Sequence, residues 1–246
     1  MKKNIKKIII GIVIVIVIIL GLIFFTAFKE LQEEDILKQE IVNYSNKDLA
    51  TDDYPIEVKT TGDRAYVEEA VKKYFKSLSD SVKAINSYLN EEELTNILTI
   101  DSLRNNSPNY TNSHAIISNT KSKVTKELEN ISSLCDEDTI KNLIDKDKLS
   151  DSEYYYDFYL DLMYTEKDLE ELKNIKEEME NLSNNLNLFL DKVDEILTFL
   201  ETNANYIEYT DTDIYISDDN ILNEYNNLVN ELTTLANNIA ETESDI

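Results

Sequence analysis

The side chains that most often carry out catalysis are scarce in this 246-residue chain. It contains one histidine, His114, and one cysteine, Cys135, so a Ser–His or Cys–His mechanism could use only these two positions. His114 follows an Asn- and Ser-rich loop and has no partner motif around it, and we interpret it as a surface or capping residue. Cys135 falls on the apolar stripe of a predicted helix, where a small buried side chain is the usual arrangement.

Oxygen atoms are the metal ligands that this chain supplies in number, since one Cys and one His cannot build a zinc site of the Cys/His type. The stretch Asp211-Thr-Asp213 begins like a calcium-binding EF-hand loop, but Ile216 stands where the loop requires glycine and Leu222 where it requires glutamate. Three glycines cannot supply the glycine-rich phosphate-binding motifs either. We therefore predict no catalytic residue, no cofactor and no enzyme activity, and leave calcium binding through general acidity as an alternative.

The densest aromatic group belongs to a short helix that is predicted to start at Ser150 or Asp151. Tyrosines grouped in this way could stack on a ligand or contact a partner. They could equally be half-buried core residues whose hydroxyl groups stay in water. The tyrosines of this candidate partner or ligand surface are Tyr154, Tyr155, Tyr156, Tyr159 and Tyr164.

An unbroken apolar run from Ile8 to Phe28 precedes all of these residues. It is long enough to cross a bilayer as a helix, which takes about 20 residues. Four lysines precede the run and acidic residues follow it, so the positive-inside rule predicts a cytoplasmic tail over 1–7 and an extracytoplasmic remainder. A cleaved signal peptide is the alternative, but Phe25 and Phe28 stand where a cleavage site needs small residues. We expect a single-pass protein of the cell membrane that contacts the lipid bilayer through Ile8 to Phe28.

The chain is strongly acidic, with 24 basic and 49 acidic residues and a net charge of −25. Four of the basic residues and none of the acidic ones precede residue 29, so the remainder carries 20 positive and 49 negative charges, a net of −29. A field of this sign repels phosphate groups and excludes nucleic-acid binding. It attracts cations or basic partners, although a solvated surface is the plainer interpretation.

The predicted fold is mainly α, because three glycines and two prolines leave little turn chemistry for an all-β protein. We expect an N-terminal transmembrane helix over 8–28, a stalk and linker over 29–62, and an extracytoplasmic helical domain over 63–246. That domain is predicted to be an antiparallel helical bundle with long coiled-coil-like helices. Alternating apolar residues on both sides of Thr210-Asp-Thr-Asp213 predict one small β-hairpin over about 206–217.

Apolar residues at spacings of three and four predict the long helices of this domain. The longest is predicted over 165–203, with Thr165 and Asp168 at its start and a heptad seam of the kind found in coiled coils. Other helices are predicted over 63–89, 90–98, 113–135, 136–144, 151–164 and after Asp218-Asp219, and a loop over 105–109. The expected seam residues are Leu169, Leu172, Lys176, Met179, Ser183, Leu186, Leu190, Val193, Leu197 and Leu200.

Several short motifs after Thr60 form a pattern: Thr61-Gly62-Asp63, Val67-Glu68-Glu69, Val71-Lys72-Lys73-Tyr74, Leu94-Thr-Asn-Ile-Leu98 and Ser107-Pro108. This pattern resembles uncharacterised single-span membrane proteins of low-GC Gram-positive bacteria, and the resemblance covers most of the chain after Thr60. It implies a helical domain outside the membrane. The family has no assigned activity that could be carried over to this chain.

Two functions from different classes fit these observations. The first is a protein-interaction or scaffold role in the bacterial cell envelope, exerted on another envelope protein or through self-association. The second is a helical bundle that senses a small molecule or a cation and signals through a membrane partner, because only seven residues precede the membrane segment. A cell-wall hydrolase is a third hypothesis, supported only by carboxylates without a defined place.

Overall fold

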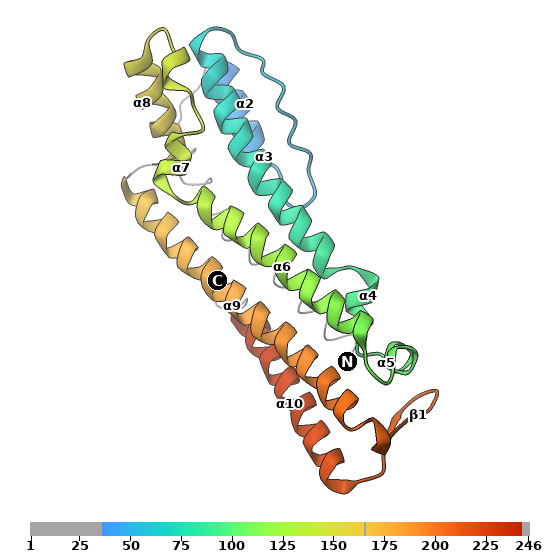
Figure 1. The fold of residues 1–246 in the computed structure, drawn as a ribbon. Helices are drawn as coiled ribbons and strands as arrows, with labels where there is room; N and C mark the ends of the chain where they lie inside the picture. The colour runs from blue at the N-terminus through green and yellow to red at the C-terminus, as the bar shows by residue number, and fades with distance from the viewer. Residues whose placement is uncertain (1–35, 165, 243–246) are drawn as a thin grey trace. The chain divides into compact units, whose positions relative to one another are not determined.

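The computed structural model describes residues 36–164 and 166–242 (Figure 1). These residues form nine α-helices and one antiparallel two-stranded sheet. The prediction of a mainly helical protein with one small hairpin is therefore confirmed for the described part of the chain. No helix within these two ranges combines the length and the hydropathy that crossing a bilayer requires. The predicted membrane segment, Ile8 to Phe28, lies outside the described residues, and the single-pass topology stays a prediction.

The described residues divide into two compact units, neither of which is continuous in sequence. Unit 1 consists of 85–126 and 181–242, and unit 2 of 36–84 and 127–180. Three long helices supply residues to both units: α3 (Asp63–Leu89), α6 (Thr111–Leu134) and α9 (Glu166–Thr202).

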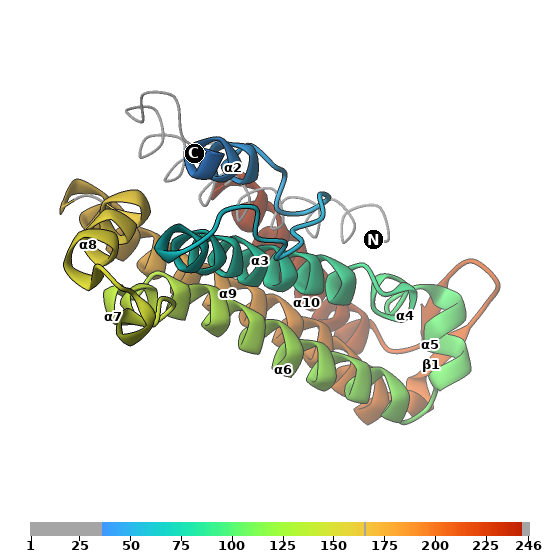
Figure 2. The same ribbon diagram turned by 90° about the horizontal axis from the view of Figure 1, so that it is seen from above.

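In unit 2, α2 (Ile36–Ser45) lies beside α3, and the segment between the two helices runs along α3 (Figures 1 and 2). Leu37, Ile41 and Tyr44 of α2 are buried at helical spacing. From the connecting segment, Tyr54 stacks on Phe75 of α3 with ring centroids 6.2 Å apart. Residues 36–62 were predicted to be stalk and linker, but their apolar side chains make them part of unit 2.

The rest of unit 2 is built from short helices that follow α6. These are α7 (Glu137–Lys141), the 3-10 helix η2 (Lys146–Lys148) and α8 (Ser152–Met163). Asp151 is the N-cap of α8, and its carboxylate accepts a hydrogen bond from the backbone N of Tyr154 at 3.3 Å. Asp136 stands at the N-cap of α7 as expected, but its carboxylate accepts from Lys176 Nζ at 2.7 Å instead of capping the helix.

Unit 1 begins with the end of α3, followed by α4 (Glu92–Thr95) and α5 (Ile100–Asn106). Helix α5 was not predicted from the sequence. Thr99 caps it by accepting a hydrogen bond from Ser102 N, and Leu103 is the one buried residue of the helix. With one buried residue in seven, α5 has no repeating apolar pattern, and this explains why the sequence did not predict the helix.

Helix α9 has the bounds that its apolar period predicted, within one residue at each end, while Thr165 itself lies outside the described residues. Its buried face is wider than the predicted heptad seam. In unit 1, Phe189, Ile196 and Phe199 are buried together with the seam residues Leu190, Val193 and Leu197. Such a face suits packing against several neighbours rather than a two-stranded coiled coil alone.

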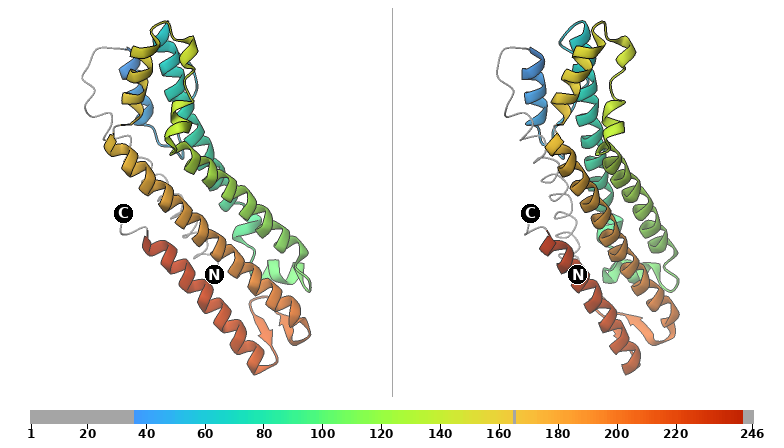
Figure 3. Two further views of the ribbon diagram at one scale, coloured as in Figure 1. Left: turned by 60° about the vertical axis from the view of Figure 1, so that its left-hand side comes forward. Right: turned by 90° about the vertical axis from the view of Figure 1, so that its left-hand side faces the viewer.

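The predicted hairpin joins α9 to α10 (Asp219–Thr242), and the two helices run antiparallel side by side in both views of Figure 3. A short 3-10 helix, η3 (Ala204–Tyr206), leads into β1 (Ile207–Tyr209), which pairs with β2 (Ile214–Ile216). The hydroxyl group of Tyr209 is hydrogen-bonded to that of the buried Tyr110, which lies between α5 and α6. This contact, together with the burial of Ile216, gives the two short strands the packing that an isolated hairpin lacks.

Candidate interaction surface

The aromatic group of α8 is positioned by contacts at both ends of the helix. Near its start, Asp63 of α3 accepts hydrogen bonds from Ser150 N at 3.0 Å, Ser150 Oγ at 2.7 Å and Asp151 N at 2.9 Å. These bonds lower the pKa of the Asp63 carboxyl group. Further along, the buried Tyr159 donates its hydroxyl hydrogen to Ile140 O of α7 at 2.7 Å. Burial raises the pKa of Tyr159 well above its ordinary value, so its hydroxyl stays protonated and available as a donor.

The five tyrosines of the candidate surface do not share one face of unit 2. Tyr159 is fully buried, and Tyr164, at the C-cap of α8, is half-buried with its hydroxyl directed to Glu137 Oε1 at 3.4 Å. Half-buried Tyr156 receives Lys146 Nζ over its ring, 4.6 Å from the centroid. Only Tyr154 is largely exposed, at 60%. The function of this group as a partner or ligand surface stays a prediction.

Tyr154 forms a compact aromatic surface with two neighbours on the same helix. The rings of Tyr154 and Phe158 are parallel, with centroids 6.3 Å apart and an interplanar angle of 1°. Tyr155 meets Tyr154 edge-on, with centroids 5.0 Å apart. Phe158, which the candidate set did not include, therefore belongs to the surface. We call Tyr154 and Phe158 the ring pair.

Acidic side chains surround the ring pair. Glu153, Asp157 and Asp161 are exposed, and within the described part of the chain none of the three forms an ion pair. Asp157 and Asp161 lie three and seven residues after Tyr154, and Phe158 lies four after it. These four residues therefore form one stripe along two turns of helix.

A second cluster, which the sequence analysis did not identify, buries charge inside unit 2. Lys72 of α3 is buried, and its Nζ donates to Glu68 Oε1 at 2.6 Å, to Glu40 Oε2 at 3.0 Å and to Glu57 O at 2.6 Å. The same ammonium group lies 4.8 Å from the ring centroid of Tyr44. All three hydrogen atoms of this ammonium group thus have an acceptor.

The carboxylate of Glu68 is equally well satisfied. It accepts hydrogen bonds from the backbone N of Lys59 and Thr60, from Thr60 Oγ1 and from Lys72. Burial is the largest single effect and opposes ionisation of both partners, but all the hydrogen bonds and opposite charges around them together outweigh it. They lower the pKa of Glu68 and raise the pKa of Lys72. This cluster, in which Lys72 and Glu68 have all of their side-chain polar atoms hydrogen-bonded, holds α2, the connecting segment and α3 together.

His114 contacts two carboxylates of α9 within unit 1. Its Nδ1 is 2.6 Å from Asp194 Oδ1, and its Nε2 is 3.8 Å from Glu201 Oε2. The side chain is partly exposed, in line with the surface position that the sequence indicated. A catalytic histidine needs one ring nitrogen beside a hydroxyl or thiol nucleophile. In His114 the nearest acidic group to Nδ1 is Asp194 and the nearest to Nε2 is Glu201, so both nitrogens are directed to carboxylates.

The other residues considered for chemistry have structural contacts. Cys135 is buried, its Sγ donates to Ile131 O at 3.5 Å, and burial raises the pKa of the thiol to about 12, which keeps it unreactive. The prediction that it is a buried apolar side chain is confirmed. Asp211 of the EF-hand-like stretch is bound by Arg104 at 3.0 Å. Among the residues that the structure describes, no three His, Cys, Asp or Glu side chains are grouped so that they could hold a metal ion.

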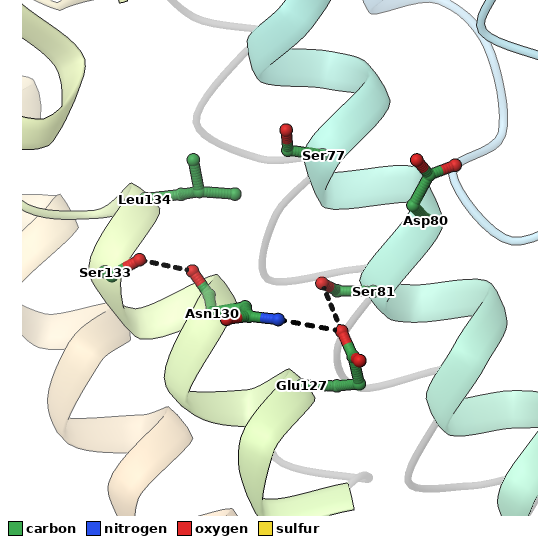
Figure 4. A pocket seen from close by; sticks show the side chains of 7 residues that line it. All are labelled: Ser77, Asp80, Ser81, Glu127, Asn130, Ser133 and Leu134. Carbon is green, nitrogen blue, oxygen red and sulfur yellow. Dashed lines mark hydrogen bonds between the residues drawn. The ribbon is translucent and has the colours of Figure 1, made fainter. Parts of the chain in front are cut away.

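A polar groove of about 360 Å³ lies between α3 and α6 in unit 2 (Figure 4). On one side of it, Glu127 Oε2 accepts hydrogen bonds from Ser81 Oγ at 2.8 Å and from Asn130 Nδ2 at 3.0 Å. None of the five candidate tyrosines lines this groove. The residues that do are Ser77, Asp80, Ser81, Glu127, Asn130, Ser133 and Leu134.

Comparisons with protein-family models, curated proteins and solved structures found nothing similar to this chain. The resemblance to single-span membrane proteins of Gram-positive bacteria therefore stays a prediction. Any functional assignment rests on the geometry of the ring pair, the buried charge cluster and the polar groove.

The buried charge cluster predicts a large difference between two adjacent lysines of α3. Lys72→Met leaves Glu68 and Glu40 buried without their shared cation, and we expect it to lower the free energy of unfolding by about 3–5 kcal/mol. Lys73→Met removes an exposed partner of Glu69 and is expected to change it by less than about 1 kcal/mol. Urea unfolding followed by circular dichroism measures both. Equal effects of the two variants would contradict the structural role of the cluster.

The same cluster predicts how stability depends on pH. The pKa of Glu68 in the folded protein lies below the ordinary value of 4.5, so its contribution is complete above about pH 4.5 and is lost as the pH falls through the folded pKa. The wild type loses this stabilisation as the pH falls, because the carboxylate of Glu68 becomes protonated. The variant Glu68→Gln has no carboxylate at this position and does not lose it. The difference in unfolding free energy between wild type and Glu68→Gln should therefore shrink between about pH 6 and pH 3. A difference that stays constant over this range would refute the assignment.

Proposed function

We propose that this protein is a membrane-anchored interaction module of the bacterial cell envelope that docks another protein on α8 of unit 2. The observation that carries the proposal is the exposure of Tyr154, whose ring stacks on the half-buried ring of Phe158. Tyr154 leaves 60% of its surface in water although the same helix buries Tyr159 completely. Exposed, ordered aromatic side chains are typical of protein-binding surfaces, because they provide large contact areas and lose little conformational entropy on binding.

The anchoring part of the proposal is supported by the sequence. The apolar run from Ile8 to Phe28 has the length of a membrane helix, and four lysines precede it, whereas a single lysine, Lys29, follows it directly and is succeeded by acidic residues. This arrangement favours α8 on the extracytoplasmic side. A docking surface also benefits from a rigid position in the fold. Asp63 fixes the start of α8 to α3, and Tyr159 fixes α8 to α7.

Photocrosslinking in cells that express the full chain tests the proposal. A photoreactive amino acid at Tyr154 is expected to capture a different protein reproducibly. The same amino acid at Tyr215, on the hairpin in unit 1, serves as the matched control, because Tyr215 is exposed to almost the same extent, 58%. If position 154 gives no adduct beyond those at position 215, the proposed function is wrong.

The polar groove favours a second candidate function, the sensing of a small molecule or a cation. Its two carboxylates, Asp80 and Glu127, and its three serines suit a small polar ligand that carries positive charge. Asp80 is paired with Lys76 at 2.6 Å, so Glu127 is the better anchor for such a ligand.

Thermal unfolding tests the sensing function with calcium and with small primary amines as probes. A ligand that binds the folded protein at 100 times its dissociation constant stabilises it by about 2.7 kcal/mol, so the unfolding temperature should rise. Glu127→Gln is expected to abolish the rise, and Glu129→Gln, which changes an exposed carboxylate on the same helix, to preserve it. No rise with any of these probes, or an equal rise in both variants, would rule out this groove as their site.

A further inference from the structure

We propose that the ring pair Tyr154–Phe158 binds a lysine or arginine side chain from a basic segment of the partner protein. This inference rests on the proposed function and specifies the chemistry of the partner. It follows from the geometry of the two rings, the charge around them and the contacts that other rings of this protein make.

The two rings form a receptor for a cation. An aromatic face attracts a positive charge through its quadrupole, and the attraction is effective within about 6 Å of the centroid. The ring of Tyr154 is largely exposed and can offer a face to one ammonium or guanidinium group, and the parallel ring of Phe158 lies beside it on the next turn of the helix. Arginine can in addition stack its planar group on a ring.

The protein already places its own lysines over other tyrosine rings. Lys72 lies 4.8 Å from the ring centroid of Tyr44, and Lys146 lies 4.6 Å from that of Tyr156. Among the side chains that the structure describes, no ammonium group lies over the ring of Tyr154 or Phe158. The exposed ring of Tyr154 therefore differs from the rings of Tyr44 and Tyr156, because no lysine of the described residues lies over it.

The charge around the ring pair selects a basic occupant. Glu153, Asp157 and Asp161 are exposed and have no cationic partner among the described residues. Carboxylates beside an aromatic face add a Coulomb attraction for the same cation. They repel acidic proteins and phosphate-bearing surfaces.

The occupant is a protein segment rather than a small molecule or a second copy of this chain. The ring pair does not line the groove described above, and a single exposed helix face encloses no small ligand. A second copy carries the same net charge of −25, which opposes self-association. The stripe from Tyr154 to Asp161 covers two turns and suits an extended or helical segment with basic residues along one side.

A peptide titration with the full chain in a zwitterionic detergent tests the inference. The probe is a fluorescent peptide of alternating lysine and glycine, and its control is the same peptide with every lysine acetylated. We expect Tyr154→Leu/Phe158→Leu to weaken binding of the lysine peptide about tenfold, which corresponds to about 1.4 kcal/mol. Leucine retains apolar surface and net charge, so this loss reports on the aromatic faces. Tyr215→Leu, the matched control beside Glu208, should leave binding unchanged.

Three results would overturn the inference. One is equal binding of the lysine peptide to wild type and the double leucine variant, since the acidic field alone would then account for binding. Another is equal binding of the lysine and acetyl-lysine peptides. The third is a loss in Tyr154→Phe as large as that in Tyr154→Leu, since phenylalanine keeps the ring face. Thermal unfolding checks that each variant folds, and Tyr154→Leu alone carries the test if the double variant does not.

The outcome is distinguishable from failure of the proposed function. If the photoreactive residue at position 154 gives a specific adduct but the ring variants bind the peptide as the wild type does, the docking function is supported and only the basic nature of the partner is refuted. Absence of any specific adduct would remove the docking function itself, whatever the peptide titration shows.

Discussion

The buried ammonium group of Lys72 holds together three segments in the described part of unit 2. An ammonium group away from water is stable only if partners replace its hydration, and Lys72 receives them from Glu68, Glu40 and the carbonyl group of Glu57. These three acceptors lie on α3, on α2 and on the segment between them. Apolar contacts alone would tolerate a helix sliding by a fraction of a turn, but three short hydrogen bonds to one nitrogen do not. The cluster therefore sets the register of α2 on α3, and α3 in turn carries the carboxylate of Asp63, which receives the start of α8.

The tyrosines of α8 illustrate how one residue type serves two purposes on one helix. Tyr159 and Tyr154 are five positions apart, so they point to different sides of α8. Tyr159 buries its ring and uses its hydroxyl to hold α7, whereas Tyr154 keeps its ring in water beside Phe158. The contrast between an interior whose buried charges are paired and an exterior that is acidic and aromatic is the main reason to look for function on the surface of this unit. The buried cluster holds α2 and α3 together, and the ring pair belongs to the docking surface that we propose.

Periodicity in the sequence was sufficient to predict the long helices and the hairpin, because each buries a continuous apolar face. It missed α5, where Leu103 alone is buried, and it treated residues 36–45 as a stalk although Leu37 and Ile41 pack in unit 2. Periodicity could not predict the buried charge cluster, for a different reason. Glu68 and Lys72 are four positions apart and look like an ordinary surface pair, while Glu40 lies 32 positions from Lys72. For α8, the sequence indicated an aromatic group, but the division into buried and exposed rings depends on which face meets α7.

Because the chain is synthesised from its N-terminus, the two units are completed at different times. Unit 2 has all of its residues once position 180 has been made, whereas unit 1 still waits for 181–242. Until then Ile117 and Val124 of α6, which are buried in the finished protein, lack that half of their unit. If synthesis pauses after residue 180 and before residue 242, the side chains of Ile117 and Val124 stay without these neighbours. The strong negative charge of the chain discourages association between such intermediates, because molecules of like charge repel one another.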